Sequence, residues 1–149
     1  MKSLVLLVFR LYVGWIWLRT GIEKVPDPEW MKTGSAVRDY WVAATTTTQG
    51  PRQRIKYAWY RSLLQELTKR ELHPQFAKAV VAAHFVSGIA LVAGVGVRPG
   101  SMIGIAQNMA FLLAGSTGNN PPMLLAQTVL AMSDPTDTER IGLGLLTRR

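Results

Sequence analysis

The sequence predicts an all-α integral membrane protein: a four-helix bundle with a long extramembrane loop that contains an amphipathic helix. Two observations support this prediction. Apolar and charged residues are segregated along the 149-residue chain, and the segments almost free of charge approach the length of a membrane-spanning helix. A chain of this length suffices for one domain. The fold class therefore follows from where the charges lie.

The formal net charge of +8 raises the question of a nucleic-acid partner. The basic residues do not form one stripe with interleaved aromatic residues, so no nucleic-acid partner is expected. A lipid bilayer with an anionic surface, or an acidic partner protein, fits the charge better. The chain contains no cysteine, which excludes disulfides, thiolate metal sites and thiol redox chemistry.

The first predicted span covers residues 3–21 and would rise about 28 Å as a helix, close to the thickness of a hydrocarbon core. Its aromatic residues Tyr12, Trp15 and Trp17 become more frequent toward the C-terminal end, as in the aromatic belt at a membrane interface. A cleaved signal peptide is the alternative. Because Arg10 interrupts the apolar run and no small-residue cleavage site follows, we expect an uncleaved spanning helix.

Residues 22–75 carry most of the charges of both signs and are predicted to lie outside the membrane. Within them, residues 55–72 follow the pattern of an amphipathic helix, which would lie on the membrane surface or cap the bundle. An ordinary surface helix is the alternative. The predicted apolar face contains Ile55, Trp59, Leu63 and Leu67. The residues predicted to dock a partner protein are Trp59, Arg61, Lys69 and Arg70.

Three further spans are predicted, over residues 76–97, 101–116 and 121–132. They would rise about 33, 24 and 18 Å, so the last either is sheltered by protein or re-enters the membrane without crossing it. Arg98, Pro99 and Gly100 are predicted to form the reversal between the first two of them. In the tail, residues 133–149, the apolar patch IGLGLL is predicted to form a short interfacial helix.

The distribution of basic residues predicts the orientation. With four spans, one side of the membrane receives the N-terminus, the reversal and the tail, and with them Lys2, Arg98, Arg140, Arg148 and Arg149. Long loops count little in the positive-inside rule. We therefore expect a multi-pass protein of a prokaryotic inner (cytoplasmic) membrane, with both termini in the cytoplasm.

Arg10 lies inside the first predicted span, where a charge costs roughly 2.5 kcal/mol or more. It either extends to the near interface or requires a partner or a water-filled cavity. Asp134 and Asp137, at the end of the fourth span, are the candidate partners, together with a charge on another subunit. Arg19 is placed to pair with Glu23, four residues further along the helix.

His84 lies nine residues into the second predicted span. It could be a ligand of a metal, haem or chlorophyll, a proton carrier, or a hydrogen-bond donor to a quinone carbonyl. Hydrogen-bonded packing between helices is the simpler interpretation. The same two interpretations, packing between helices or contact with a ligand, apply to Gln107, Asn108 and Gln127. One histidine is no metal site, and no phosphate loop, zinc-protease motif or nucleophile elbow is present. The sequence predicts no catalytic residue and no metal.

Four stretches of the chain, in order, resemble the DoxX family, which includes the DoxD-type small subunit of thiosulfate:quinone oxidoreductase. They are RLYVGWIWLRTGIEKVPDPEW, YAWYRSLLQ, GIALVAGVGVR and NMAFLLAGSTGNNP. The resemblance implies a single four-helix membrane domain over residues 1–149 that associates with redox partners. Where relatives commonly carry an acid early in the second span, this chain has His84, and a Gly-Leu-Asp pattern near the end appears as Gly142-Leu143-Gly144.

Two functions follow from these observations. The favoured one is a non-catalytic membrane subunit of a larger redox or photosynthetic electron-transfer complex, in which any chlorophyll or haem belongs to the partner subunits. The other is a quinone-reactive subunit of the DoxD type, which passes electrons from thiosulfate to quinone. The candidate contacts for a quinone or pigment are Arg10, Trp15, Trp17, His84 and Asn108. A transporter is less favoured, since the sequence shows no inverted repeat.

Overall fold

The computed structural model describes residues 2–46, 55–116, 118–139 and 142. Within these ranges every regular element is an α-helix, which confirms the predicted all-α class. The helices are α1 (Lys2–Lys24), α2 (Pro28–Met31), α3 (Ser35–Thr46), α4 (Ala58–Lys69), α5 (His73–Ala93), α6 (Val97–Leu113), α7 (Asn120–Met132) and α8 (Pro135–Thr138). The helix predicted for the patch IGLGLL falls outside the described residues, apart from Gly142.

Two of the described helices are long and apolar enough to cross a membrane, Ser3–Lys24 in α1 and His73–Ala93 in α5. The other two helices of the predicted bundle are shorter. α6 has 17 residues and α7 has 13, so they rise about 26 and 20 Å.

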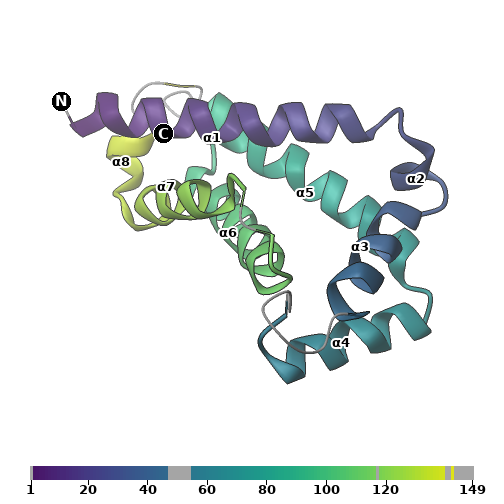
Figure 1. Cartoon of the computed structure of the whole chain (residues 1–149). Helices are drawn as coiled ribbons and strands as arrows, with labels where there is room; N and C mark the ends of the chain where they lie inside the picture. Colours follow the sequence, from purple (N-terminus) through teal and green to yellow (C-terminus); the bar gives the residue numbers. More distant parts are fainter. Residues whose placement is uncertain (1, 47–54, 117, 140–141, 143–149) are drawn as a thin grey trace.

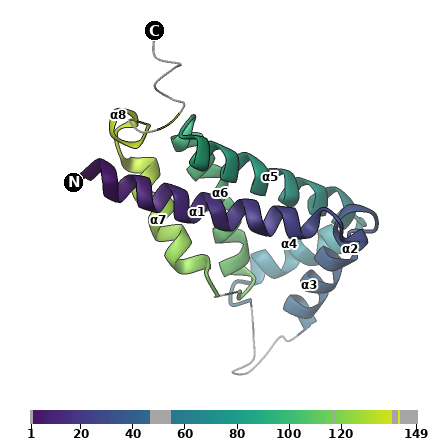
Figure 2. The same cartoon turned by 90° about the horizontal axis from the view of Figure 1, so that it is seen from above.

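The four helices α1, α5, α6 and α7 contact one another in a ring, in which α1 packs on α5, α5 on α6, α6 on α7 and α7 on α1 (Figures 1 and 2). Small residues allow the close crossing of α1 and α5. A Cβ atom added at Gly14 would lie 2.9 Å from a methyl of Val92, and one at Gly88 would lie 2.7 Å from Leu18. The apolar core between the helices includes Val13, Trp17 and Leu91.

The reversal between α5 and α6 lies a few residues before its predicted position. α5 ends at Ala93, and the chain turns at Gly94 and Gly96, whose φ angles are +72° and +63°. Left-handed backbone of this kind is accessible to glycine at little cost. Pro99, predicted to lie in the turn, instead lies in the first turn of α6, where a missing N–H is tolerated. The predicted reversal at residues 98–100 is therefore wrong.

The described residues between α1 and α5 are folded against the rest of the chain. They form the three helices α2, α3 and α4, and α3 packs against both α4 and α5 (Figure 1). A second apolar core joins Trp41 of α3 and Leu64 of α4 to Ala77 of α5 and Ala114 at the end of α6.

The buried side of α4 differs from the predicted apolar face. Tyr60 and Leu64 are buried, whereas Trp59 and Leu63 are exposed and Ile55 lies before the helix begins. The tyrosine hydroxyl provides the reason, because it donates a hydrogen bond to the carbonyl oxygen of Ala110 in α6 at 2.9 Å. A tertiary contact thus decides which face of α4 is inside. Its location on a membrane surface stays a prediction.

Candidate functional site

A cavity among the described residues has a volume of about 570 Å³ and is partly open to the outside. It lies between the second half of α1 and helices α3, α4, α5 and α6, and it falls within the size range of small-molecule sites. Most of its lining is apolar. Its aromatic side chains are Trp17, Trp30, Tyr40, Trp41, Tyr60, Phe76 and Phe111. Such a lining suits a flat, largely apolar ring compound.

The aromatic walls are held by contacts between elements far apart in the sequence. Trp41 of α3 packs edge-on against Phe76 of α5, with ring centroids 5.3 Å apart. Tyr60 fixes α4 to α6 through its hydrogen bond to Ala110. Burial raises the pKa of the Tyr60 phenol, and the nearby Tyr40 adds to this shift. The phenol therefore stays protonated at neutral pH and retains its donated hydrogen bond.

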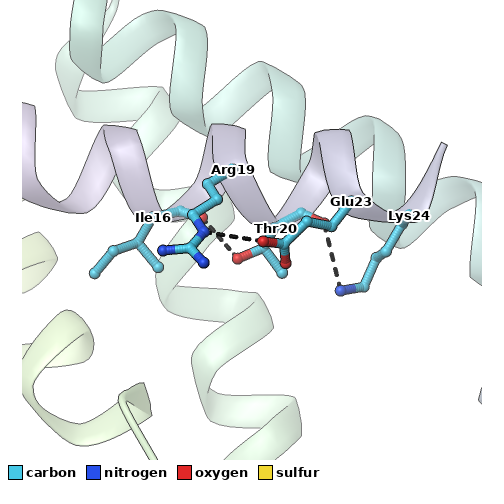
Figure 3. Close-up of polar contacts among 5 residues, drawn as sticks. All are labelled: Ile16, Arg19, Thr20, Glu23 and Lys24. Carbon is cyan, nitrogen blue, oxygen red and sulfur yellow. Dashed lines mark hydrogen bonds and ion pairs between the residues drawn. The ribbon is translucent and has the colours of Figure 1, made fainter.

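Thr20 and Lys24, near the end of α1, line the cavity, and Figure 3 shows their polar contacts. The hydroxyl of Thr20 donates to the carbonyl oxygen of Ile16 at 2.7 Å, and Lys24 Nζ approaches the carbonyl oxygen of Thr20 at 3.5 Å. The same ammonium group lies 4.6 Å from the centre of the Trp30 ring, in cation–π geometry. Lys24 therefore lines the cavity beside an aromatic wall.

The predicted pairing of Arg19 with Glu23 is confirmed, with 2.9 Å between Nε and Oε1 (Figure 3). Both side chains are exposed. Exposed ion pairs of this kind contribute little to stability, so the pair has no evident part in the cavity.

His84 lies at the cavity wall and is 1% exposed. Its Nδ1 atom is 2.6 Å from the carbonyl oxygen of Val80. Because a carbonyl oxygen can only accept, Nδ1 carries the proton, and in the neutral ring Nε2 is a bare acceptor. The Trp17 ring packs edge-on against the imidazole with centroids 4.6 Å apart. The simple packing role and a ligand contact are thus both compatible with its position.

The structure separates the five predicted quinone or pigment contacts. Trp17 and His84 come together in the cavity lining. Trp15 points outward and is 61% exposed, and Arg10 lies toward the other end of α1. Asn108 is fully buried between helices, where its Nδ2 donates to Gln127 Oε1 at 2.6 Å. The amide pair acts as a link between α6 and α7.

Arg10 is 2% exposed and is bonded to α8, the helix that contains the predicted partner residue Asp137. Its Nη1 donates to the backbone carbonyl oxygen of Thr138 in α8 at 2.6 Å. A Cβ atom added at Gly94 would lie 2.5 Å from the same nitrogen, so the glycine leaves room for the guanidinium. The buried arginine thus joins α1, α8 and the turn after α5.

Two of the four residues predicted to dock a partner make polar contacts within the chain. Arg61 Nη2 donates to the carbonyl oxygen of Ile55 at 2.8 Å, and Arg70 Nε pairs with Glu66 Oε1 at 2.8 Å. The hydrogen bond and the charge of Arg70 lower the pKa of the Glu66 carboxyl. Trp59 and Lys69 are exposed on α4. Partner docking by this set stays a prediction.

Several lining residues were not predicted, among them Lys24, Tyr40 and Trp41. The only signal for them in the sequence is the density of aromatic residues in an otherwise charged region. Across the described ranges, no group of three or more His, Cys, Asp or Glu side chains could hold a metal ion.

Comparison with known proteins identifies a family. The family model for DoxX matches residues 5–117, a range that runs from the first turn of α1 to beyond the end of α6. No curated protein and no solved structure matches the chain.

Proposed function

The chain belongs to the DoxX family, and from this premise we propose that it is a membrane subunit that holds a quinone-class ligand for a redox partner protein. The family and the two long apolar helices indicate a membrane protein. The aromatic cavity is the observation that carries the ligand proposal. Its volume suits a substituted quinone ring with the first part of its tail.

In this proposal α1, α5, α6 and α7 span the membrane as a four-helix bundle. Their ring of contacts supports it, because each helix buries surface against two others. The beginning of α1, the turn at Gly94 and helix α8 meet around Arg10 at one end of the bundle. The basic residues of these segments favour the cytoplasmic side of a prokaryotic inner membrane for that end.

The electrons would come from the partner. The chain has no cysteine, so it can carry neither a thiol redox pair nor a cysteine-ligated iron–sulfur cluster. We therefore favour an accessory subunit that binds and positions the ligand over an enzyme complete in itself. The exposed Trp59 and Lys69 of α4 supply the proposed docking surface for the partner.

Filling the cavity should weaken ligand binding. Val80 lines the cavity, so Val80→Phe adds an aromatic ring to that space. We expect the purified protein to bind decylubiquinone, measured by quenching of tryptophan fluorescence, and Val80→Phe to weaken binding by about thirtyfold, which corresponds to about 2 kcal/mol.

The matched control is Val86→Phe, on the same helix at an exposed position outside the cavity lining. It should bind as the wild type does. Absence of binding by the wild type, or equal weakening by the two variants, would refute the proposed function.

A further inference from the structure

We propose that the cavity selects the reduced form of its ligand, a hydroxyl-bearing quinol, over the oxidised quinone, and that His84 Nε2 accepts the hydrogen bond of the ligand hydroxyl. This inference rests on the proposed function. It extends that function by naming the chemical form that the site recognises.

The first step is the tautomer of His84. The 2.6 Å contact with the Val80 carbonyl oxygen requires a proton on Nδ1. The ring is 1% exposed, and burial in apolar surroundings favours its neutral form. The remaining nitrogen, Nε2, then carries a lone pair and no proton. His84 consequently offers its surroundings an acceptor, not the donor to a quinone carbonyl that the sequence suggested.

The second step is the chemistry of the two ligand forms. A quinone has only carbonyl oxygens at its ring, and these accept hydrogen bonds. A carbonyl oxygen next to Nε2 would place two lone pairs against each other. A quinol hydroxyl can donate to Nε2 and still accept a second bond through its oxygen. The bare nitrogen therefore discriminates between the two forms.

The neighbouring Gln107 does not occupy this nitrogen. Its side chain lies close enough to the imidazole to affect its electrostatics, but by geometry neither its Nε2 nor its Oε1 atom has a hydrogen-bond partner among the described residues. Gln107 is not among the residues that line the cavity. Nε2 of His84 is therefore left to the ligand.

The orientation of the imidazole is fixed from two directions. The bond to Val80 holds one edge of the ring, and the edge-on Trp17 ring packs against it. An acceptor held in place favours the matching donor more strongly than one that can rotate away. Sites built to bond a substrate hydroxyl reject analogues that lack it. We expect a preference of at least about tenfold for the quinol.

The test compares the two ligand forms by calorimetric titration of the detergent-purified protein under anaerobic conditions. The wild type should bind decylubiquinol about ten times more tightly than decylubiquinone. His84→Phe keeps a ring of similar size and removes the acceptor. It should retain the affinity for the quinone within about threefold and lose the preference. His73→Phe, at the other histidine, lies outside the cavity lining and should retain it.

A chemical control makes the test independent of the folding of any variant. The dimethyl ether of decylubiquinol has the same ring and tail but no O–H donor, so the wild type should bind it no more tightly than the quinone. Equal affinity of the wild type for quinol and quinone, tight binding of the ether, or a preference kept by a folded His84→Phe would each overturn the inference. If none of the three compounds binds, both this inference and the proposed function are wrong.

Discussion

Gly34→Ala is expected to destabilise the protein by about 2–5 kcal/mol. Gly34 has φ of +68°, a left-handed conformation that costs other residues about 1–2 kcal/mol. An added Cβ would also lie 2.5 Å from Pro74 Cα and 2.7 Å from its nitrogen. These are backbone atoms and cannot rotate away, so overpacking adds about 1–3 kcal/mol. The variant should force the start of α3 away from α5 and open the aromatic wall of the cavity.

Thermal unfolding in one detergent, followed by circular dichroism, measures this effect. The matched control is Gly118→Ala. Gly118 also has a positive φ, +28°, but no atom lies within 4 Å of an added Cβ. It should therefore lose far less stability than Gly34→Ala. Equal unfolding midpoints for Gly34→Ala and the wild type would show that α3 does not pack against the start of α5 as described.

Gly104→Ala is expected to cost about 2–3 kcal/mol, although alanine is the better helix former by about 1 kcal/mol. An added Cβ would overlap the amide nitrogen of Gln127 and lie 2.9 Å from Trp17 Nε1. Gln127 is fully buried and is bonded to Asn108 at 2.6 Å. Moving its side chain would therefore break that bond, leave buried polar groups unpaired and separate α6 from α7.

Gly21→Ala is the control for this substitution. Gly21 is also helical, but its added Cβ would meet the nearest atoms, in His84 and Phe85, at 3.3 Å, where a small shift suffices. Its thermal midpoint should stay close to that of the wild type. A Gly104→Ala protein as stable as Gly21→Ala would contradict the close packing of α6 and α7.

The helices that the sequence predicted best are those whose signal is local. Hydropathy alone located α1 and α5, since each is a long apolar run. The turn between α5 and α6 was misplaced because Gly94 and Gly96 lie within such a run, whereas the proline and arginine that suggested a turn lie in the first turn of α6. The turn lies at the two glycines because they can adopt the left-handed backbone that it requires, and the polar residues that follow do not determine its position.

The fold of residues 22–75 depended on contacts that no local pattern reveals. Residues 55–72 have an apolar stripe, but this stripe does not determine which side of α4 is buried. Tyr60 determines it, because its hydroxyl donates a hydrogen bond to a carbonyl oxygen in α6 that is fifty residues away in the sequence. For the same reason the aromatic walls formed by α3 and α4 could not be predicted. Their partners in α5 and α6 are distant in the sequence.

The candidate site was predicted in part. Trp17 and His84 were identified as polar or aromatic residues inside predicted spans, and the structure brings them into contact. The same criterion selected Arg10 and Trp15, which lie elsewhere, because position along a span does not specify which way a side chain points. The direction of hydrogen bonding at His84 required the contact with Val80, which only the structure supplies.

Photoaffinity labelling with an azido-ubiquinone of short tail is the most direct test of the central claim, that the aromatic cavity is the ligand site. Labelled peptides identified by mass spectrometry should come from α3, α4 and α5, and excess decylubiquinol should suppress the labelling. Val80→Phe should show little label at these positions. Label confined to the exposed outer face of α1, around Leu4 and Val8, and insensitive to Val80→Phe would contradict the account.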